Sequence, residues 1–159
     1  MRRADVRGLP AVTRSGVICG SVADLLFGAH GDRVVGLILA GGAWGQQRLL
    51  PYEVVAAIGP AAVVVRELAT VSLPRCPAIR RLRRKHTDLV GCRILQDDGS
   101  ELGTVMDVCF DPENGQVTGY VVSGGPLADL VRGWSFVSLE RIWRGSCAGR
   151  GVVLLLANR

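Results

Sequence analysis

Residues 101–122 read ELGTVMDVCFDPENGQVTGYVV, which places two apolar runs on either side of the turn Asp111-Pro112-Glu113-Asn114-Gly115. Proline suits the second position of a tight turn, and Asn-Gly supplies residues that tolerate a positive φ. The stretch therefore predicts two β-strands joined by a short turn.

The same stretch occurs earlier in the chain at an offset of 83 residues. Nine of the 27 positions from Gly16 to Gly42 are identical to their counterparts without a gap, against roughly two expected from background composition. The matched pairs are Gly16 and Gly99, Gly20 and Gly103, Val22 and Val105, Asp24 and Asp107, Phe27 and Phe110, Val34 and Val117, Gly36 and Gly119, and Gly41-Gly42 and Gly124-Gly125. The chain therefore contains an internal duplication.

The duplication divides the 159 residues into two small domains. We expect the first copy at residues 1–67, a linker at 68–87 and the second copy at 88–159. Hydrophobic content of 48% with 21 glycines is typical of short strands and tight turns. Copies of this size have marginal cores and can need each other for stability. The predicted fold class is all-β.

Each copy is expected to contain four strands whose positions can be compared. They are 9–12, 17–27, 34–40 and 61–65 in the first copy, and 92–95, 102–110, 117–123 and 151–156 in the second. Gly20 and Gly103 lie inside the second strand, where a glycine indicates a bulge or a sharp bend. The third strand is almost wholly apolar, which predicts a central position covered on both faces.

Residues 50–55 align with residues 137–142 at an offset that has changed to 87, and each segment is expected to be a strand end followed by one helical turn. Pro51 suits the first helical position, and Ser138 suits a helix cap. Glu53 and Glu140 would then lie in the first turn, where exposed N–H groups favour an anion.

With these motifs the second copy resembles the PRC-barrel family, named for the reaction-centre H subunit, whose cytoplasmic part carries the same barrel. The resemblance rests on Asp98-Gly99, the segment Glu101 to Val108, the turn at 111–115 and Val137-Ser138-Leu139-Glu140. The first copy matches more weakly. It departs at Gly28-Ala29-His30-Gly31-Asp32, which replaces the proline-containing turn, and Ser138 stands where the family usually has proline.

The resemblance implies two small, strongly bent β-barrels of about six strands each, with a single short helical turn per copy. The family has no shared catalytic residues, and its members serve as docking or scaffolding units. One is the C-terminal half of a ribosome-maturation factor, which contacts a small-subunit ribosomal protein. Others are stand-alone bacterial barrels, some linked to sporulation.

No catalytic, metal or cofactor site is expected. His30 and His86 have no counterparts in the other copy, so a triad duplicated with the fold is not indicated. The acids retained in both copies (Asp24 and Asp107, Glu53 and Glu140) can serve acid–base chemistry or bind a hard cation. We favour a structural interpretation, in which the aspartates accept turn N–H groups and the glutamates lie at helical N-termini.

The expected compartment is the cytoplasm. No apolar run reaches the length of a membrane span, and the N-terminus has no apolar signal region. The five cysteines form no C-x-x-C pair and do not match between the copies. They are typical of reduced thiols used as small apolar residues.

Large apolar residues in the loops are the candidate site for a protein partner. Such side chains near an arginine rim are typical anchors of an interface. The same side chains can instead cap their own barrel or pack one copy on the other, and the sequence leaves these alternatives open. The candidates are Trp44, Leu127, Leu130, Val131 and Trp134.

The linker at 68–87 is the second candidate site, because it carries six basic residues and no acid. The net charge of the chain is +5, so the remainder sums to −1. A basic segment can neutralise phosphates of RNA or of an anionic membrane surface, the membrane being the weaker alternative, but charged linkers are usually just solvated. The candidate phosphate-binding residues are Arg80, Arg81, Arg83, Arg84 and Lys85.

The function predicted from the sequence is that of a non-enzymatic tandem PRC-barrel adaptor that docks a protein partner. The alternative is an RNA- or ribosome-associated maturation factor that uses the basic linker.

Overall fold

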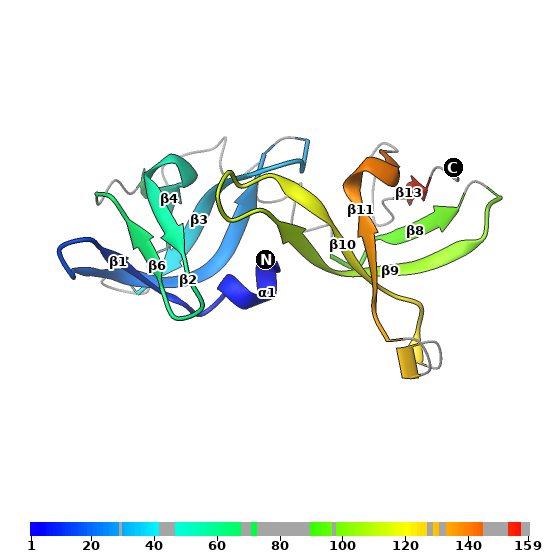
Figure 1. Cartoon of the computed structure of the whole chain (residues 1–159), viewed down its shortest axis with the longest axis horizontal. Coiled ribbons are helices and arrows are strands. Elements are labelled where there is room, and N and C mark those ends of the chain that lie inside the picture. The colour runs from blue at the N-terminus through cyan, green and yellow to red at the C-terminus, as the bar shows by residue number, and fades with distance from the viewer. Residues whose placement is uncertain are drawn as a thin grey trace. The chain divides into compact units, whose positions relative to one another are not determined.

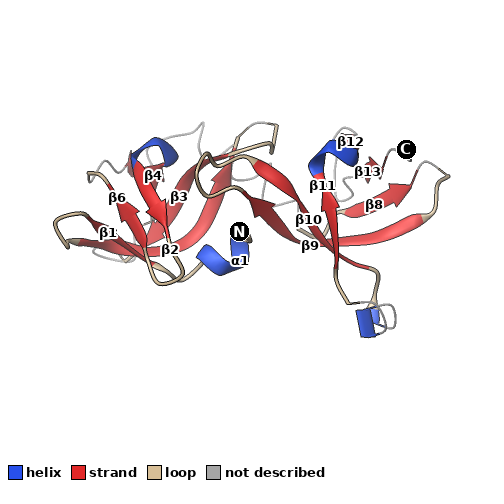
Figure 2. Ribbon diagram, in the orientation of Figure 1, coloured by secondary structure: helices blue, strands red, loops and turns tan. Residues whose placement is uncertain are grey.

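The computed structural model divides the chain into two compact units, each described by itself. Unit 1 comprises Met1–His86 together with Phe110–Val117, and unit 2 comprises Thr87–Cys109 together with Thr118–Arg159. The ribbon consists mostly of strands in both units (Figure 2). The residues that the structure describes are 1–28, 30–41, 47–67, 71–72, 90–96, 98–126, 129–130, 133–144 and 153–156.

Unit 1 contains a seven-stranded sheet in the order β5-β6-β1-β2-β3-β4-β7. Figure 1 labels β1, β2, β3, β4 and β6 of this sheet. Most neighbours are antiparallel, but β1 and β6 pair in parallel. A short helix, α1 (Arg3–Val6), precedes the sheet, and its Val6 is buried. The strands are β1 (Pro10–Thr13), β2 (Ile18–Phe27), β3 (Val34–Ala40), β4 (Arg48–Pro51), β5 (Val55–Ile58), β6 (Val63–Val65) and β7 (Val71–Ser72).

Unit 2 contains a six-stranded sheet in the order β11-β10-β9-β8-β13-β12. The parallel pair recurs here between β13 and β8. The described strands are β8 (Arg93–Gln96), β9 (Glu101–Phe110), β10 (Val117–Ser123), β11 (Ser135–Ser138), β12 (Ile142–Arg144) and β13 (Val153–Leu156).

The strand registers confirm the duplication and the all-β fold class. Leu49 pairs with Ile38 in the first sheet, and Phe136 pairs with Val121 in the second. These pairs correspond at the offsets of 83 and 87 residues. Strand β7 continues the first sheet beyond β4, whereas β11 is the last strand on its side among the described strands of the second sheet.

Gly20 and Gly103 occupy equivalent backbone settings, next to the bulge that the sequence predicted. The register slips by one residue just before each glycine, between β1 and β2 and between β8 and β9. Their φ angles are +132° and +152°. A Cβ on Gly20 would lie 2.4 Å from the carbonyl oxygen of Ala40, and one on Gly103 would lie 2.2 Å from that of Ser123. Only glycine fits this close approach of two strands.

The predicted strands agree with the observed ones within two residues at their ends, and 34–40 and 117–123 agree at both ends. The sequence analysis missed β5, β7, β12 and α1. These elements are four residues long or shorter, so they show no clear hydrophobic period; the predicted strands of similar length were identified by comparison of the two copies.

The helical turn after β4 and β11 is present as a 3₁₀ turn in each unit, η2 (Tyr52–Val54) and η4 (Leu139–Arg141). The predicted cap was wrong: Ser138 occupies the N-cap position but makes no side-chain capping hydrogen bond. Pro51 is also the N-cap residue rather than the first helical residue. Both residues end an extended strand.

The core of unit 1 is centred on β3, which is covered on both faces as predicted. Val34, Leu37, Ile38 and Leu39 on this strand are all buried. Each fully buried side chain of this size contributes about 1.5–3 kcal/mol relative to exposure. In unit 2 the corresponding core strands contribute the buried residues Ile94, Val105, Val108, Tyr120, Val121 and Val122.

No helix among the described residues combines the length and the apolar character that a membrane crossing would need.

Candidate docking surface

The retained aspartate of the first copy serves the structure. Arg3 donates from Nε and Nη2 to the two carboxylate oxygens of Asp24 at 2.7 and 2.8 Å. The backbone N–H of Leu25 donates to Oδ1 of the same carboxylate at 2.8 Å. Both side chains of this ion pair are largely shielded from solvent. A bidentate, charge-assisted contact of this kind fixes α1 against β2.

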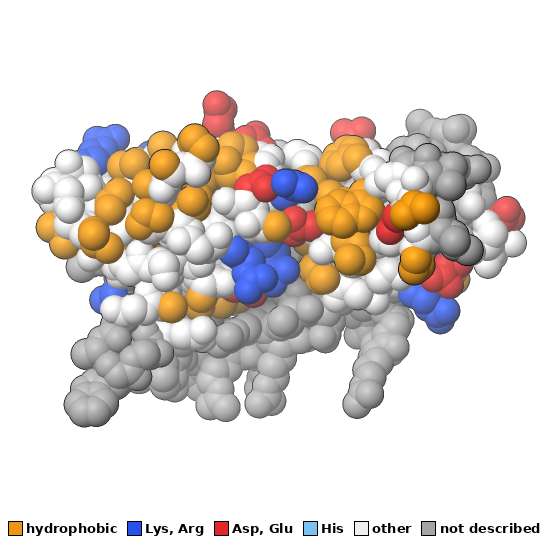
Figure 3. Space-filling model, turned by 90° about the horizontal axis from the view of Figure 1, so that it is seen from below, with side chains coloured by type: hydrophobic (Ala, Val, Ile, Leu, Met, Phe, Trp, Pro, Cys, Tyr) orange, Lys and Arg blue, Asp and Glu red, His pale blue; other side chains and the backbone are white. Residues whose placement is uncertain are grey.

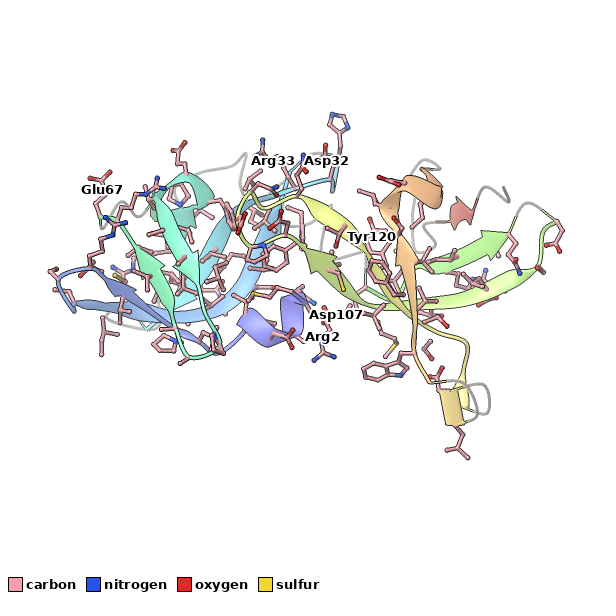
Figure 4. The ribbon with its side chains drawn as sticks, viewed as in Figure 1. Arg2, Asp32, Arg33, Glu67, Asp107 and Tyr120 are labelled. Atoms are coloured by element: carbon pink, nitrogen blue, oxygen red, sulfur yellow. The ribbon has the colours of Figure 1, made fainter. Side chains whose placement is uncertain are left out.

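Asp107 is the counterpart of Asp24 and is buried in unit 2. Its Oδ1 accepts a hydrogen bond from the N–H of Val108 at 2.9 Å, which repeats the contact of Asp24 with Leu25. Asp107 lies on β9 and Tyr120 on β10, as Figure 4 shows. Glu53 and Glu140 lie in the 3₁₀ turns and are exposed. The contacts of the aspartates agree with the structural role that the sequence favoured.

The hairpin tip, Phe110–Val117, belongs to unit 1 and contributes backbone partners there. Tyr52 donates its hydroxyl to the carbonyl oxygen of Pro112 at 2.9 Å, and the N–H of Val34 donates to the carbonyl oxygen of Gly115 at 2.7 Å. Burial, with a smaller contribution from the charge of Asp111, raises the pKa of Tyr52 to about 12. The sequence identified this turn correctly, but nothing in its pattern indicated these contacts.

One face of the first sheet is covered by a compact set of side chains, here called the outer cluster. It contains Leu26, Ile38 and Leu49, which are buried, with the partly buried Ala23 and Val35 packed against them. Leu49 lies over the backbone of Gly36, because a Cβ on that glycine would meet its Cδ1 at 2.7 Å.

The equivalent face of unit 2 carries different residues with different exposure. The counterparts of the outer cluster are Met106, Cys109, Thr118, Val121 and Phe136. Phe136 lies over Gly119 as Leu49 lies over Gly36, because a Cβ on Gly119 would meet its ring at 2.7 Å. Yet Phe136 is 59% exposed and Met106 is 44% exposed, whereas Leu49 is 8% exposed.

Trp134 extends this exposed face. It lies two residues before Phe136, a spacing that places both side chains on the same side of an extended chain, and it is 58% exposed. Since Ala23 packs on the outer cluster with Leu49, its counterpart Met106 is expected on the face that bears Phe136. We call Met106, Trp134 and Phe136 the docking surface. Figure 3 shows apolar side chains gathered on the visible face of this unit, in the right half of the view.

The loop between β10 and β11 presents a further apolar side chain, Leu130, which is 88% exposed. The loop is tied to β10 by Asp129, whose carboxylate accepts hydrogen bonds from the hydroxyl of Ser123 and from the N–H of Gly124. The N–H of Asp129 in turn donates to the carbonyl oxygen of Gly125 at 2.9 Å. Leu130 is therefore exposed to solvent directly after Asp129, whose side chain is hydrogen-bonded to the end of β10.

The structure describes two of the five predicted partner-binding residues, Leu130 and Trp134, and both are exposed. The others, Trp44, Leu127 and Val131, lie outside the described residues. So do all of the predicted phosphate-binding residues, Arg80, Arg81, Arg83, Arg84 and Lys85.

Met106 and Phe136 were missed by the sequence analysis, because apolar residues in strands are usually core residues. A comparison of the two copies could have identified them. Met106 and Phe136 are larger than their counterparts Ala23 and Leu49, so the side-chain volume at these positions differs between the copies. Unit 1 has its own exposed apolar residues, Val17 and Ile18, where unit 2 has Ser100 and Glu101.

Within the described part of the chain, no group of three or more His, Cys, Asp and Glu side chains is arranged to hold a metal ion. The described features are a duplicated strand-and-bulge framework and an exposed apolar surface on one copy, which define a class of small, duplicated all-β domains.

Comparison with protein families gives this class a name. The family model of the PRC-barrel domain matches the chain twice, over residues 1–70 and over residues 83–142. The chain therefore belongs to the PRC-barrel family, with two copies of the domain in tandem. None of the curated proteins that were compared with the chain matches it.

Proposed function

We propose that this tandem PRC-barrel protein is a non-enzymatic adaptor of the cytoplasm that docks a protein partner on the docking surface of unit 2. The observation that carries the proposal is the contrast between equivalent positions: Leu49 is buried, and its counterpart Phe136 is exposed beside Trp134. Aromatic and methionine side chains are enriched at protein interfaces relative to the rest of a protein surface.

The geometry of the retained acids supports the non-enzymatic part of the proposal. The carboxylate of Asp24 is engaged by Arg3 and by a backbone N–H. Both oxygens of this carboxylate therefore accept hydrogen bonds that join parts of the fold. An aspartate at this position in both copies, Asp24 and Asp107, is explained by the hydrogen bond that each accepts from the next backbone N–H.

The test is capture of partners on the full chain and on a variant with Met106→Ser, Trp134→Ser and Phe136→Ser. We expect the variant to lose at least about tenfold of the bound partner, since exposed aromatic anchors carry much of the binding energy of an interface. The matched control is Val17→Ser with Ile18→Ser, which removes exposed apolar residues from unit 1 and should leave the partner bound. Equal capture by all three proteins would contradict the proposal.

A second candidate function, association with RNA or the ribosome, is supported by the charge of residues 68–87. Nuclease treatment before capture separates the two candidates. An adaptor keeps its partner after RNA is digested, whereas an RNA-dependent partner is lost. Replacement of Arg80, Arg81, Arg83 and Arg84 by Ser should weaken RNA retention and flatten its dependence on salt only if these residues neutralise phosphates.

A further inference from the structure

The edge of the second sheet differs from the matching edge of the first. In unit 1 the outer side of β4 is paired with β7, antiparallel, with Val71 opposite Leu49 and Ser72 opposite Arg48. In unit 2 the counterpart of β4 is β11, and among the described strands it ends the sheet. Every second residue of such an edge strand directs its N–H and C=O away from the sheet.

The sequence of β11 lacks two features that commonly protect an edge strand. Proteins commonly protect an edge strand with a charged side chain or a proline. The sequence of β4 contains both, Arg48 and Pro51, and its outer side is nevertheless paired with β7. The counterparts in β11 are Ser135 and Ser138, so the strand carries neither protection.

The pairing of β4 with β7 shows which kind of segment such an edge accepts. It is extended and antiparallel, with a β-branched apolar residue opposite the position of Leu49 and a small polar residue next to it. On β11 the apolar residue would fall opposite Phe136, whose exposed ring lies over Gly119. The docking surface would then lie beside the added strand and receive its apolar side chains.

We propose that the partner binds by strand addition: an extended apolar segment of the partner protein pairs antiparallel with β11, as β7 pairs with β4. Main-chain hydrogen bonds supply affinity in this mode of recognition, and pockets for alternate side chains supply specificity. The inference rests on the proposed function, because it specifies how the docking surface is used.

The probe is a synthetic peptide with the sequence of residues 68–73, Leu-Ala-Thr-Val-Ser-Leu. It is added at millimolar concentration to the full chain, and amide hydrogen exchange is measured along the backbone. We expect exchange within Ser135–Ser138 to slow about tenfold, the effect of roughly one net hydrogen bond per protected amide. Exchange within Arg48–Pro51 should not change, because that edge is already paired.

The matched control is the same peptide N-methylated at the residues that copy Val71 and Ser72. It keeps the side chains but loses the N–H donors of these two residues, and the added methyl groups prevent the close approach of the two strands, so it should protect far less. Absence of slowing with the unmodified peptide, equal slowing with the methylated one, or slowing confined to Arg48–Pro51 would overturn strand addition. So would protection of β11 that rises with protein concentration alone, because a second copy would then occupy the edge.

The failure of this inference can be told from failure of the proposed function. Should the triple serine variant lose its partner while both peptides behave alike, docking stands and strand addition fails. Should the peptide protect β11 while the serine variant still captures its partner, strand addition at this edge stands and the proposed docking function fails.

Discussion

Leu49 and Phe136 occupy the same place in two copies of one framework, and only one of them is covered. Each side chain lies over a glycine of the neighbouring strand, Gly36 or Gly119. Each strand follows the same register with its neighbour. Leu49 nevertheless belongs to a buried cluster, whereas Phe136 is exposed. Duplication thus preserved the framework, and the two faces diverged.

The difference separates positions that build the fold from positions available for binding. Gly20 and Gly103, or Asp24 and Asp107, are the same in both copies because the bulge and the strand contacts require them. Ala23 and Met106 differ, and so does their surrounding: Ala23 packs against a buried cluster, whereas Met106 is exposed. In a duplicated protein the copies therefore act as controls for each other.

The largest expected effect comes from breaking the shared framework with Gly103→Ala. The new Cβ would overlap the carbonyl oxygen of Ser123 at 2.2 Å, at a φ of +152° that side chains rarely adopt. Strain and overlap together should lower the free energy of unfolding by about 3–5 kcal/mol, measured by urea denaturation. Gly20→Ala should cost a similar amount, since its setting is equivalent.

Gly99→Ala is the control for this substitution. It also has a positive φ, but no atom lies within 4 Å of its added Cβ. We expect a loss of about 1 kcal/mol from backbone strain alone. A loss for Gly103→Ala as small as that for Gly99→Ala would show that the two strands do not approach each other as described.

The second prediction compares the cost of truncating Leu49 in unit 1 with that of truncating Phe136 in unit 2. Leu49→Ala should cost about 2–4 kcal/mol, because it leaves a cavity in the buried outer cluster. Phe136→Ala should cost less than about 1 kcal/mol, because the ring is mostly in solvent. The measurement is the change in unfolding free energy for each variant. Equal costs would mean that Phe136 is buried in solution.

A smaller effect is expected at the anchor of α1. Asp24→Asn keeps the shape of the side chain but removes the negative charge that Nε and Nη2 of Arg3 contact. The loss should be about 1–3 kcal/mol, the range for hydrogen bonds to charged groups. Asp5→Asn removes the partner of the exposed Arg2 and should cost well under about 1 kcal/mol. Similar losses for both variants would contradict a special role for Asp24.

The smallest effect concerns Tyr52 and depends on pH. The phenol of the unfolded chain ionises near pH 10, whereas in the folded protein its pKa is raised to about 12. The neutral phenol is thus favoured by folding, so its contribution is complete below pH 10 and is lost as pH rises to about 12. Because Tyr52 is only partly buried, solvent screening limits this loss to about 1 kcal/mol.

Tyr52→Phe provides the measurement, as a comparison of unfolding free energy against pH. The variant should lack the part of the decline between pH 10 and 12 that Tyr52 contributes. At neutral pH it should be less stable by about 1 kcal/mol, since the carbonyl of Pro112 loses its donor. Identical pH profiles for the two proteins would show that Tyr52 is not shielded.

The sequence predicted the framework well because the framework is repeated. Gly20 and Gly103, matched at one offset inside long apolar runs, indicated the bulge, and the bulge is present. The parallel pairing of β1 with β6 was not predicted, since it joins segments about fifty residues apart and leaves no local period. The two-residue strand β7 is too short to be read from any pattern.

The candidate site was only partly predictable for a physical reason. Trp134 and Leu130 were recognised because large apolar residues in a loop are unusual. Phe136 and Met106 lie in strands, where an apolar residue normally indicates a core position. Whether a strand face is covered depends on what lies across it, and that information comes from distant parts of the chain.

Side-chain footprinting with hydroxyl radicals tests the central contrast most directly, because it reports the solvent exposure of individual residues in the full chain. Reactivity of each residue is normalised to that of the unfolded chain. We predict strong modification of Met106, Trp134 and Phe136, with protection of Leu26, Ile38 and Leu49. Equal protection of the two sets would show that the faces of the two copies are covered alike, and would contradict the account.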